Sequence, residues 1–170
     1  MFKLISKTIA AVAIVSVALF GSANAKTLKI ETHFTASSPN GEVAAQFAKN
    51  VEMFSGGSLK VEMFYSSSVT GKSAEVFNSA QTGIIDCDMT GAGYQTGKNA
   101  AFQFAGDVMG GYDNPYQQYE FLNYPGAQEA VDALYNKYGM TLIGWWIPGH
   151  ESLISSKPIP DVASIKDFKF

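Results

Sequence analysis

The chain has 170 residues, with 12 lysines, no arginine and 15 acidic residues, which give a formal net charge of −3 at pH 7. This weakly acidic balance argues against nucleic acid as a partner, because nucleic acid is matched by clustered lysine and arginine. The single cysteine, Cys87, excludes an internal disulfide framework, and its distance in sequence from the two histidines excludes a zinc-binding pattern.

The first 25 residues have the pattern of a secretory signal peptide. Two lysines, Lys3 and Lys7, precede an apolar run at 8–20, and the small residues at 21–25 suit a signal peptidase. A retained membrane anchor is the alternative, but the apolar run is shorter than the about 20 residues that span a bilayer. We therefore expect a mature periplasmic chain that begins at Lys26, is not embedded in the membrane, and has a net charge of −5 after loss of two lysines.

The next segments predict strands that alternate with helices. Apolar residues alternate at 27–34, 59–65 and 84–89, as in strands, and recur at helical spacing at 43–54 and 73–82. The first helix is expected to start near Pro39, to end at Ser55, and to have an apolar stripe of Val43, Phe47, Val51 and Phe54, backed by Ala44 and Ala48. The order β-α-β-α-β predicts a parallel sheet covered by helices.

The second half of the chain is less regular. A glycine-rich loop at 91–97 and an aromatic segment at 102–104 precede two predicted helices, 114–124 and 126–138, which are split at Pro125. An apolar strand is predicted at 140–147 and a short one at 153–154. The proline-rich stretch 157–160 predicts a rigid connector between two lobes.

The glycine-rich loop is a candidate ligand loop. Its Gly91, Gly93 and Gly97 do not form a dinucleotide fingerprint, because Thr96 occupies the position of the last glycine and the loop follows the third strand. It is predicted to follow the carboxyl end of a parallel strand, where open α/β sheets bind their ligands. A flexible turn is the alternative. Within the loop, Tyr94 is the expected contact, since a phenol both stacks and forms hydrogen bonds.

Four further residues are candidate ligand contacts. His33 follows the first strand and could donate a hydrogen bond to an anion or cap the loop. Of Trp145 and Trp146, one indole is expected in the core and the other, Trp146, on the floor of a cleft. His150 and Glu151 could touch a ligand or belong to an ordinary loop. Catalysis there is disfavoured, because adjacent residues of an extended chain point to opposite faces.

Asp86 and Asp88 flank Cys87 and are predicted to share one face of the third strand. Two acids at this spacing could bind a metal ion, but no third acid is nearby. We therefore expect no metal site there, and we expect Cys87 to be a packed thiol rather than a reactive one.

Several stretches of the chain resemble the extracytoplasmic solute-binding proteins of tripartite ATP-independent periplasmic (TRAP) transporters. No single motif is unique to that family, but the order and spacing are similar across the whole mature chain. The block around Lys98 and Asn99 is most similar to the branch that binds α-keto acids, lactate and related monocarboxylates, in some members with a cation. The stretches that carry the resemblance are 83–89, 94–102, 155–159 and 164–170.

The resemblance implies a fold and a function. The fold would be α/β, of the two-lobed type II periplasmic-binding-protein kind, with 26–146 as the first lobe and 147–170 as the crossover and the start of a truncated second lobe. The function would be to capture a small organic acid, such as a dicarboxylate or keto acid, for TRAP membrane permease subunits driven by an ion gradient. No catalysis and no cofactor are expected, and co-binding of a cation is left open. The expected ligand contacts are His33, Tyr94, Trp146, His150 and Glu151.

The resemblance also implies that a further lobe follows Phe170. The family normally places an arginine there that pairs with the ligand carboxylate, and this chain contains none. Two departures concern the keto-acid branch: Gln95 stands where that branch commonly has a tryptophan, and a glutamine is commonly found near the position of His150 or Glu151. The alternatives are a receptor of the ABC type with an ATP-driven permease, and an exported hydrolase that uses His150 with Ser152 or Glu151.

Overall fold

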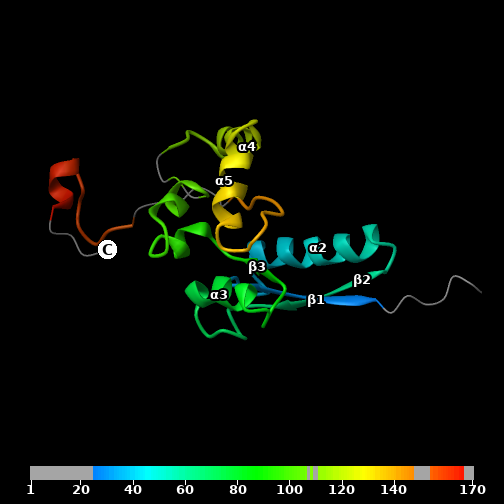
Figure 1. Ribbon diagram of the computed structural model, residues 1–170. Coiled ribbons are helices and arrows are strands. Elements are labelled where there is room, and N and C mark those ends of the chain that lie inside the picture. The colour runs from blue at the N-terminus through cyan, green and yellow to red at the C-terminus, as the bar shows by residue number, and fades with distance from the viewer. Residues whose placement is uncertain (1–24, 107, 109–110, 148–153, 167–170) are drawn as a thin grey trace, which may run out of the picture. The chain divides into compact units, whose positions relative to one another are not determined.

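The computed structural model describes residues 25–106, 108, 111–147 and 154–166, and the chain divides into two compact units between Thr90 and Gly91 (Figure 1). Each unit is described separately below. Nearly all of the predicted signal peptide lies outside the described residues, as do His150 and Glu151. The predicted first lobe, 26–146, includes parts of both units, and its boundaries stay a prediction.

The first unit is built on a three-stranded parallel sheet with the strand order β2-β1-β3. Helix α2 packs along β2, and helix α3, preceded by the single 3-10 turn η1, packs beside β3 (Figure 1). The predicted β-α-β-α-β order is therefore confirmed. The elements are β1 (Lys26–Thr32), α2 (Pro39–Phe54), β2 (Leu59–Phe64), η1 (Ser73–Glu75), α3 (Val76–Gln81) and β3 (Cys87–Met89).

The central strand, β1, is buried at its carboxyl end. The chain runs from β1 outward to β2 and then back across β1 to β3, so right-handed crossovers place α2 and α3 on opposite faces of the sheet. Consecutive residues of a strand point to opposite faces, and here Ile30, Glu31 and Thr32 are 2%, 0% and 0% exposed. Both faces of this strand end are therefore covered.

Helix α2 starts and ends as predicted, but it buries only part of the predicted face. Ser38 caps its first turn, where the side-chain oxygen accepts a hydrogen bond from the Gly41 N–H at 3.0 Å. The buried residues are Gly41, Ala44 and Ala48, whereas two members of the expected stripe, Val43 and Phe54, are 58% and 79% exposed. Ala44 and Ala48 are therefore buried as predicted, whereas Val43 and Phe54 are not, because small residues let this helix approach its neighbours closely.

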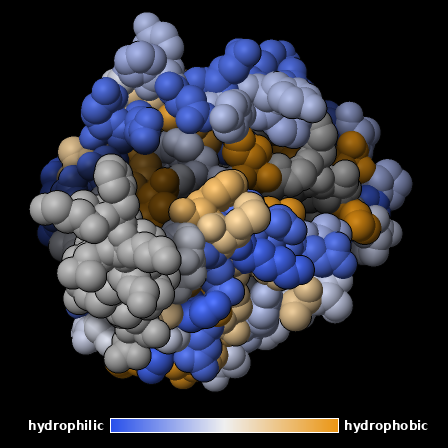
Figure 2. All heavy atoms as spheres, turned by 90° about the vertical axis from the view of Figure 1, so that its right-hand side faces the viewer, coloured by the Kyte–Doolittle hydropathy of each residue, from blue (hydrophilic) through white to orange (hydrophobic). Residues whose placement is uncertain are grey.

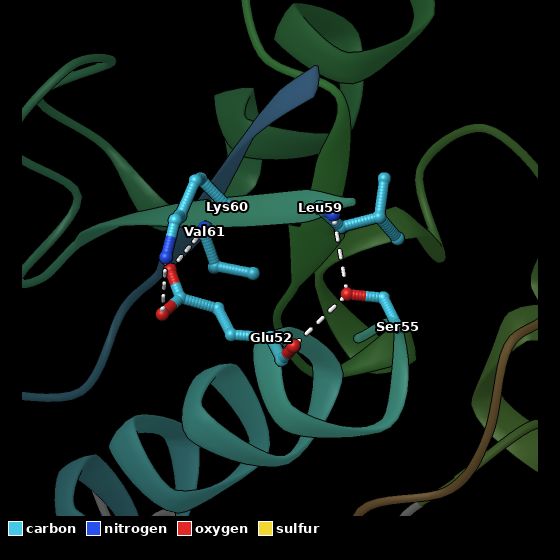
Figure 3. A network of polar contacts seen from close by, with 5 residues as sticks. All are labelled: Glu52, Ser55, Leu59, Lys60 and Val61. Carbon is cyan, nitrogen blue, oxygen red and sulfur yellow. Dashed lines mark hydrogen bonds and ion pairs between the residues drawn. The ribbon is translucent and has the colours of Figure 1, made fainter. Parts of the chain in front are cut away.

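The last turn of α2 protects the outer edge of β2 (Figure 3). The Glu52 carboxylate accepts a hydrogen bond from the Val61 N–H at 2.9 Å, and the Ser55 hydroxyl accepts one from the Leu59 N–H at 3.1 Å. The Lys60 ammonium lies 3.7 Å from the other Glu52 oxygen. Since β2 pairs with β1 on one side only, these contacts occupy backbone groups that could otherwise recruit a foreign strand.

The second unit consists of helices and turns in its described part. Asn114 caps the first turn of α4 by accepting hydrogen bonds from the Tyr116 and Gln117 N–H groups, and Gly126, at a φ of 99°, precedes α5. Both helices were predicted, with slightly longer bounds. The elements are η2 (Ala92–Gln95), η3 (Ala100–Phe104), α4 (Pro115–Asn123), α5 (Ala127–Asn136) and η4 (Val162–Ile165).

Phe102 is the largest fully buried side chain of this unit. Its ring meets the rings of Tyr135 and Tyr138, with centroids 5.2 Å and 5.5 Å away. The Tyr138 hydroxyl also donates a hydrogen bond to the Lys98 carbonyl at 3.4 Å. These contacts fasten the segment after the glycine-rich loop to the end of α5.

The predicted strand at 140–147 is absent from the described structure, where these residues form no regular element. The Leu142 N–H donates instead to the Asp132 carboxylate of α5, at 3.0 Å. A strand exists only if a neighbour accepts its hydrogen bonds, and the described sheet contains β2, β1 and β3 alone. Of the second predicted strand, 153–154, only Ile154 is described; it is not in a strand and is 92% exposed.

Several apolar side chains are exposed in both units. On the face drawn in Figure 2, hydrophobic residues lie in separate groups among hydrophilic ones. Within the described ranges, no helix is long and apolar enough to cross a membrane. The exposed members of α2 and α4 include Val43, Met53, Phe54, Tyr116, Tyr119 and Phe121.

Candidate functional site

The carboxyl edge of the first unit's sheet is the natural place for a site. All three strands are parallel, so β1, β2 and β3 end at the same edge, after Thr32, Phe64 and Met89. Open parallel sheets bind ligands outside this edge. The residues that follow the strands here are His33, the loop 66–71 and Thr90.

The 66–71 loop is held tightly against the end of β1. Ser66 and Ser67 have φ values of 56° and 51°, a left-handed conformation that non-glycine residues rarely adopt. Their N–H groups donate to the carbonyls of Phe34 and Thr32, at 2.9 Å and 3.1 Å. Because two consecutive residues adopt this unfavourable conformation, the loop must be held in it by its contacts with neighbouring residues, since its own backbone preference would not select it.

Glu31 supplies the next attachment of the loop. One oxygen of this fully buried carboxylate accepts hydrogen bonds from the Val69 N–H at 2.7 Å and the Thr70 N–H at 3.3 Å. The other oxygen, Oε2, is buried and has no hydrogen-bond partner among the described residues. A buried carboxylate with one unsatisfied oxygen is costly, so this position calls for a physical explanation.

Asp88 lies beside Glu31 on the neighbouring strand. The two residues are register partners of β1 and β3, which places their side chains on the same face of the sheet. Burial raises the pKa of Asp88 to about 6, and the negative charge of Glu31 adds to the rise. The N–H and hydroxyl of Thr90 lie near the Asp88 carboxylate and oppose this rise in pKa. The Thr90 hydroxyl and Asp88 Oδ1 are both buried, and neither has a hydrogen-bond partner of normal geometry among the described residues.

His33, the first candidate contact, is half-buried and directly follows β1. Its ring lies 3.9 Å from that of Phe34, centroid to centroid, at an angle of 38°. Burial lowers its pKa, so the imidazole is neutral at neutral pH. A neutral imidazole can still donate one hydrogen bond, but it brings no positive charge to an anion.

Asp86 and Asp88 do not act as a pair. Asp86 precedes β3, is exposed, and accepts a hydrogen bond from the Lys29 N–H at 2.9 Å, whereas Asp88 is half-buried and its Oδ1 is fully buried. In the described part of the chain, no group of three or more histidine, cysteine or acidic residues is arranged to hold a metal ion. Burial and the two neighbouring aspartates raise the pKa of the Cys87 thiol, which favours its unreactive form.

In the second unit, the glycine-rich loop forms a single 3-10 turn, η2, that exposes Tyr94. Tyr94 is 47% exposed, while the next residue, Gln95, is 2% exposed. The Gln95 carbonyl accepts hydrogen bonds from the N–H groups of Lys98 and Asn99, at 2.9 Å and 3.2 Å. The loop is therefore an ordered turn with a buried glutamine on one side and an accessible phenol on the other.

Trp146 and Trp145 are both half-buried in the segment that follows α5. The predicted division into one core indole and one cleft indole is not visible in their burial. His150 and Glu151 lie outside the described residues. Since Tyr94 and Trp146 belong to one unit and His33 to the other, a ligand-binding role for all five candidates stays a prediction.

The sequence interpretation missed Glu31 as a functional candidate. Lys29, Glu31 and His33 alternate with apolar residues, a pattern that is typical of a solvent-facing strand side. The available signal was the β-α-β-α-β order, because the central strand of a parallel sheet is covered on both faces. An acid at such a position is expected to be buried.

Solved structures of known proteins match this fold. A TRAP periplasmic solute-binding protein from Rhodobacter sphaeroides, in an open ligand-free state, matches with a TM-score of 0.64 and 26% identity over 69% of this chain and 37% of that one. A second TRAP periplasmic solute-binding protein, from Pseudoalteromonas atlantica with bound sodium and pyruvate, matches with a TM-score of 0.62 and 20% identity. This match covers 68% of this chain and 35% of that one. DctP6 of Bordetella pertussis, an extracytoplasmic solute receptor binding pyroglutamic acid, matches with a TM-score of 0.58 and 20% identity. This match covers 69% of this chain and 38% of that one.

The chain thus spans little more than a third of the length of these structures. No curated protein matches it significantly. The model of the DctP family, described as bacterial extracellular solute-binding protein family 7, matches residues 30–170. This match covers most of the chain and begins within β1, so the chain belongs to bacterial extracellular solute-binding protein family 7.

Proposed function

We propose that this chain contributes the first lobe of a periplasmic receptor that captures a small organic acid and delivers it to a TRAP permease. The observation that carries this proposal is the family match over residues 30–170. The parallel sheet supports it, because ligands of open parallel sheets bind outside the carboxyl edge, where a second lobe could close over them. A receptor performs no bond chemistry, and we propose none here.

A small carboxylate is the proposed ligand class. The relatives with bound pyruvate and pyroglutamic acid support this choice. The keto-acid or monocarboxylate branch is proposed in particular, with a co-bound cation left open. Because this chain contains no arginine, we propose that the main partner of the carboxylate comes from a second lobe beyond Phe170.

Tyr94 is the proposed ligand contact that the described structure presents best, because its phenol is accessible on an ordered turn. Replacement Tyr94→Phe removes only the hydroxyl. We expect this change to weaken acid binding about 10-fold, as the loss of one hydrogen bond to a charged group costs about 1.5 kcal/mol. Isothermal titration calorimetry on the complete gene product measures the change.

The matched control is Tyr116→Phe, which alters an exposed phenol on α4. Its binding constant and melting temperature should equal those of the unaltered protein. Equal binding by the Tyr94→Phe protein would remove Tyr94 from the site while leaving the receptor function untouched.

Export through residues 1–25 is part of the proposal, and the extracellular placement of the family supports it. The permease class is decided by the neighbouring genes. Two membrane subunits without an ATPase would support a TRAP transporter, whereas an adjacent ATPase would favour the ABC type. Turnover of a bound ester or glycoside would instead favour a hydrolase.

A further inference from the structure

Glu31 is fully buried, and Asp88 beside it is half-buried with its Oδ1 atom buried. They are register partners on adjacent strands, which lie about 4.8 Å apart in a sheet. Each has a buried oxygen without a described partner, Glu31 Oε2 and Asp88 Oδ1. On its other side, Glu31 has Phe64 of β2 as its register partner, which offers no charge.

No positive charge faces this pair from the surrounding elements. Among the described residues, Glu31 is the only charged side chain that shifts the Asp88 pKa, and burial keeps the neighbouring imidazole of His33 neutral at neutral pH. The remaining charged groups of the strands, helices and loop around the pair are exposed, except for Glu52. Glu52 is partly buried and forms an ion pair with Lys60. These remaining charged groups are Lys26, Lys29, Glu42, Lys49, Glu52, Lys60, Glu62, Lys72, Glu75 and Asp86.

We propose that, at mildly acidic pH, Glu31 and Asp88 share a single proton in the folded protein and that this proton keeps the 66–71 loop fixed to the end of β1. A protonated Asp88 can donate its O–H to Glu31 Oε2, which satisfies the orphaned oxygens. Glu31 Oε1 then continues to accept hydrogen bonds from the N–H groups of Val69 and Thr70. Loss of the proton to solvent leaves two like charges side by side, which drives Glu31 away from the loop.

The proposal predicts a pH dependence with a definite sign. The folded protein binds the Asp88 proton about 100-fold more tightly than the unfolded chain, because the pKa is about 6 in one and 3.8 in the other. The contribution of Asp88 to the free energy of unfolding therefore falls as the pH rises from about 4 through about 6, whereas His33, whose pKa is lowered by burial, contributes in the opposite direction. Asp88→Asn should abolish this fall, since an amide N–H₂ replaces the donated O–H permanently.

The direct experiment is a carbon-13 NMR titration of the aspartate and glutamate carboxyl groups in the unaltered chain, from about pH 4 to about pH 8. Asp88 is expected to titrate with a midpoint of about 6, and the amide signals of Val69 and Thr70 are expected to shift with the same midpoint. The unaltered protein is used, so this result does not depend on the folding of any variant.

Two variants sharpen the test. Glu31→Gln keeps an oxygen for the loop amides but removes the charge, so the Asp88 midpoint should fall. Glu62→Gln, on the exposed side of β2, should leave it unchanged. The proposal is overturned if Asp88 titrates near 3.8 or if the loop amides do not follow it. It is also overturned if calcium or magnesium ions bind and Asp88→Asn abolishes that binding, since the pair would then hold a metal ion.

Discussion

Replacing Gly41 by alanine is expected to destabilise the first unit by about 3 kcal/mol or more, at the upper end of the cost of overpacking. A Cβ at position 41 would collide with the carbonyl oxygen of Thr35 and crowd that of Ala36. Both obstacles are backbone atoms of the turn that leads into α2, and the Thr35 carbonyl already accepts hydrogen bonds from the N–H and hydroxyl of Ser38. The turn cannot yield without losing its capping contacts.

Urea denaturation followed by circular dichroism measures this effect as a lower midpoint with an unchanged slope. The control is Gly97→Ala, because a Cβ there meets no atom within 4 Å and the glycine has an ordinary φ. It should change the free energy of unfolding by less than about 0.5 kcal/mol. A tolerated alanine at position 41 would show that α2 does not approach the turn as closely as described.

Phe102→Ala is expected to cost the second unit about 3–5 kcal/mol, the usual range for truncating a buried aromatic ring. The ring is fully buried against Tyr135 and Tyr138, and it joins the segment after the glycine-rich loop to α5. Its loss should also loosen the turn that presents Tyr94. Ligand binding should therefore fall together with stability.

The control for this change lies two residues away. Phe104 belongs to the same 3-10 segment, η3, but is 64% exposed, so Phe104→Ala removes the same ring without opening a cavity. Its denaturation midpoint should stay within about 0.5 kcal/mol of the unaltered protein. Equal losses from the two substitutions would mean that Phe102 is not the packing centre of this unit.

Local patterns predicted the elements of the first unit well. Alternation in β1 and β2, the Pro39 start of α2 and the glycine at the end of α3 are signals that reside within a few residues, so the sequence alone reveals them. The face that α2 buries was predicted only in part. It depends on how closely the helix approaches its neighbours, and only the packed structure shows that Gly41, Ala44 and Ala48 permit this approach.

The errors elsewhere have the same origin. The apolar run at 140–147 satisfies the local requirements of a strand, but pairing depends on a neighbour that the run itself does not specify. The Glu31–Asp88 pair depends on the register of β1 against β3, which joins residues 57 positions apart. Spacing in the sequence suggested Asp86 and Asp88 as the related acids, whereas in the structure Asp86 is exposed and Asp88 is half-buried beside Glu31.

The central claim is that this family member binds a small organic acid without transforming it. Calorimetric titration of the complete gene product with pyruvate, lactate and pyroglutamate, followed by recovery of the ligand, tests that claim directly. We expect saturable binding of at least one acid with a dissociation constant in the micromolar range or tighter, about −8 kcal/mol or more favourable, and recovery of the acid unchanged. Absence of binding by every small carboxylate tried, or recovery of a chemically altered ligand, would contradict the account.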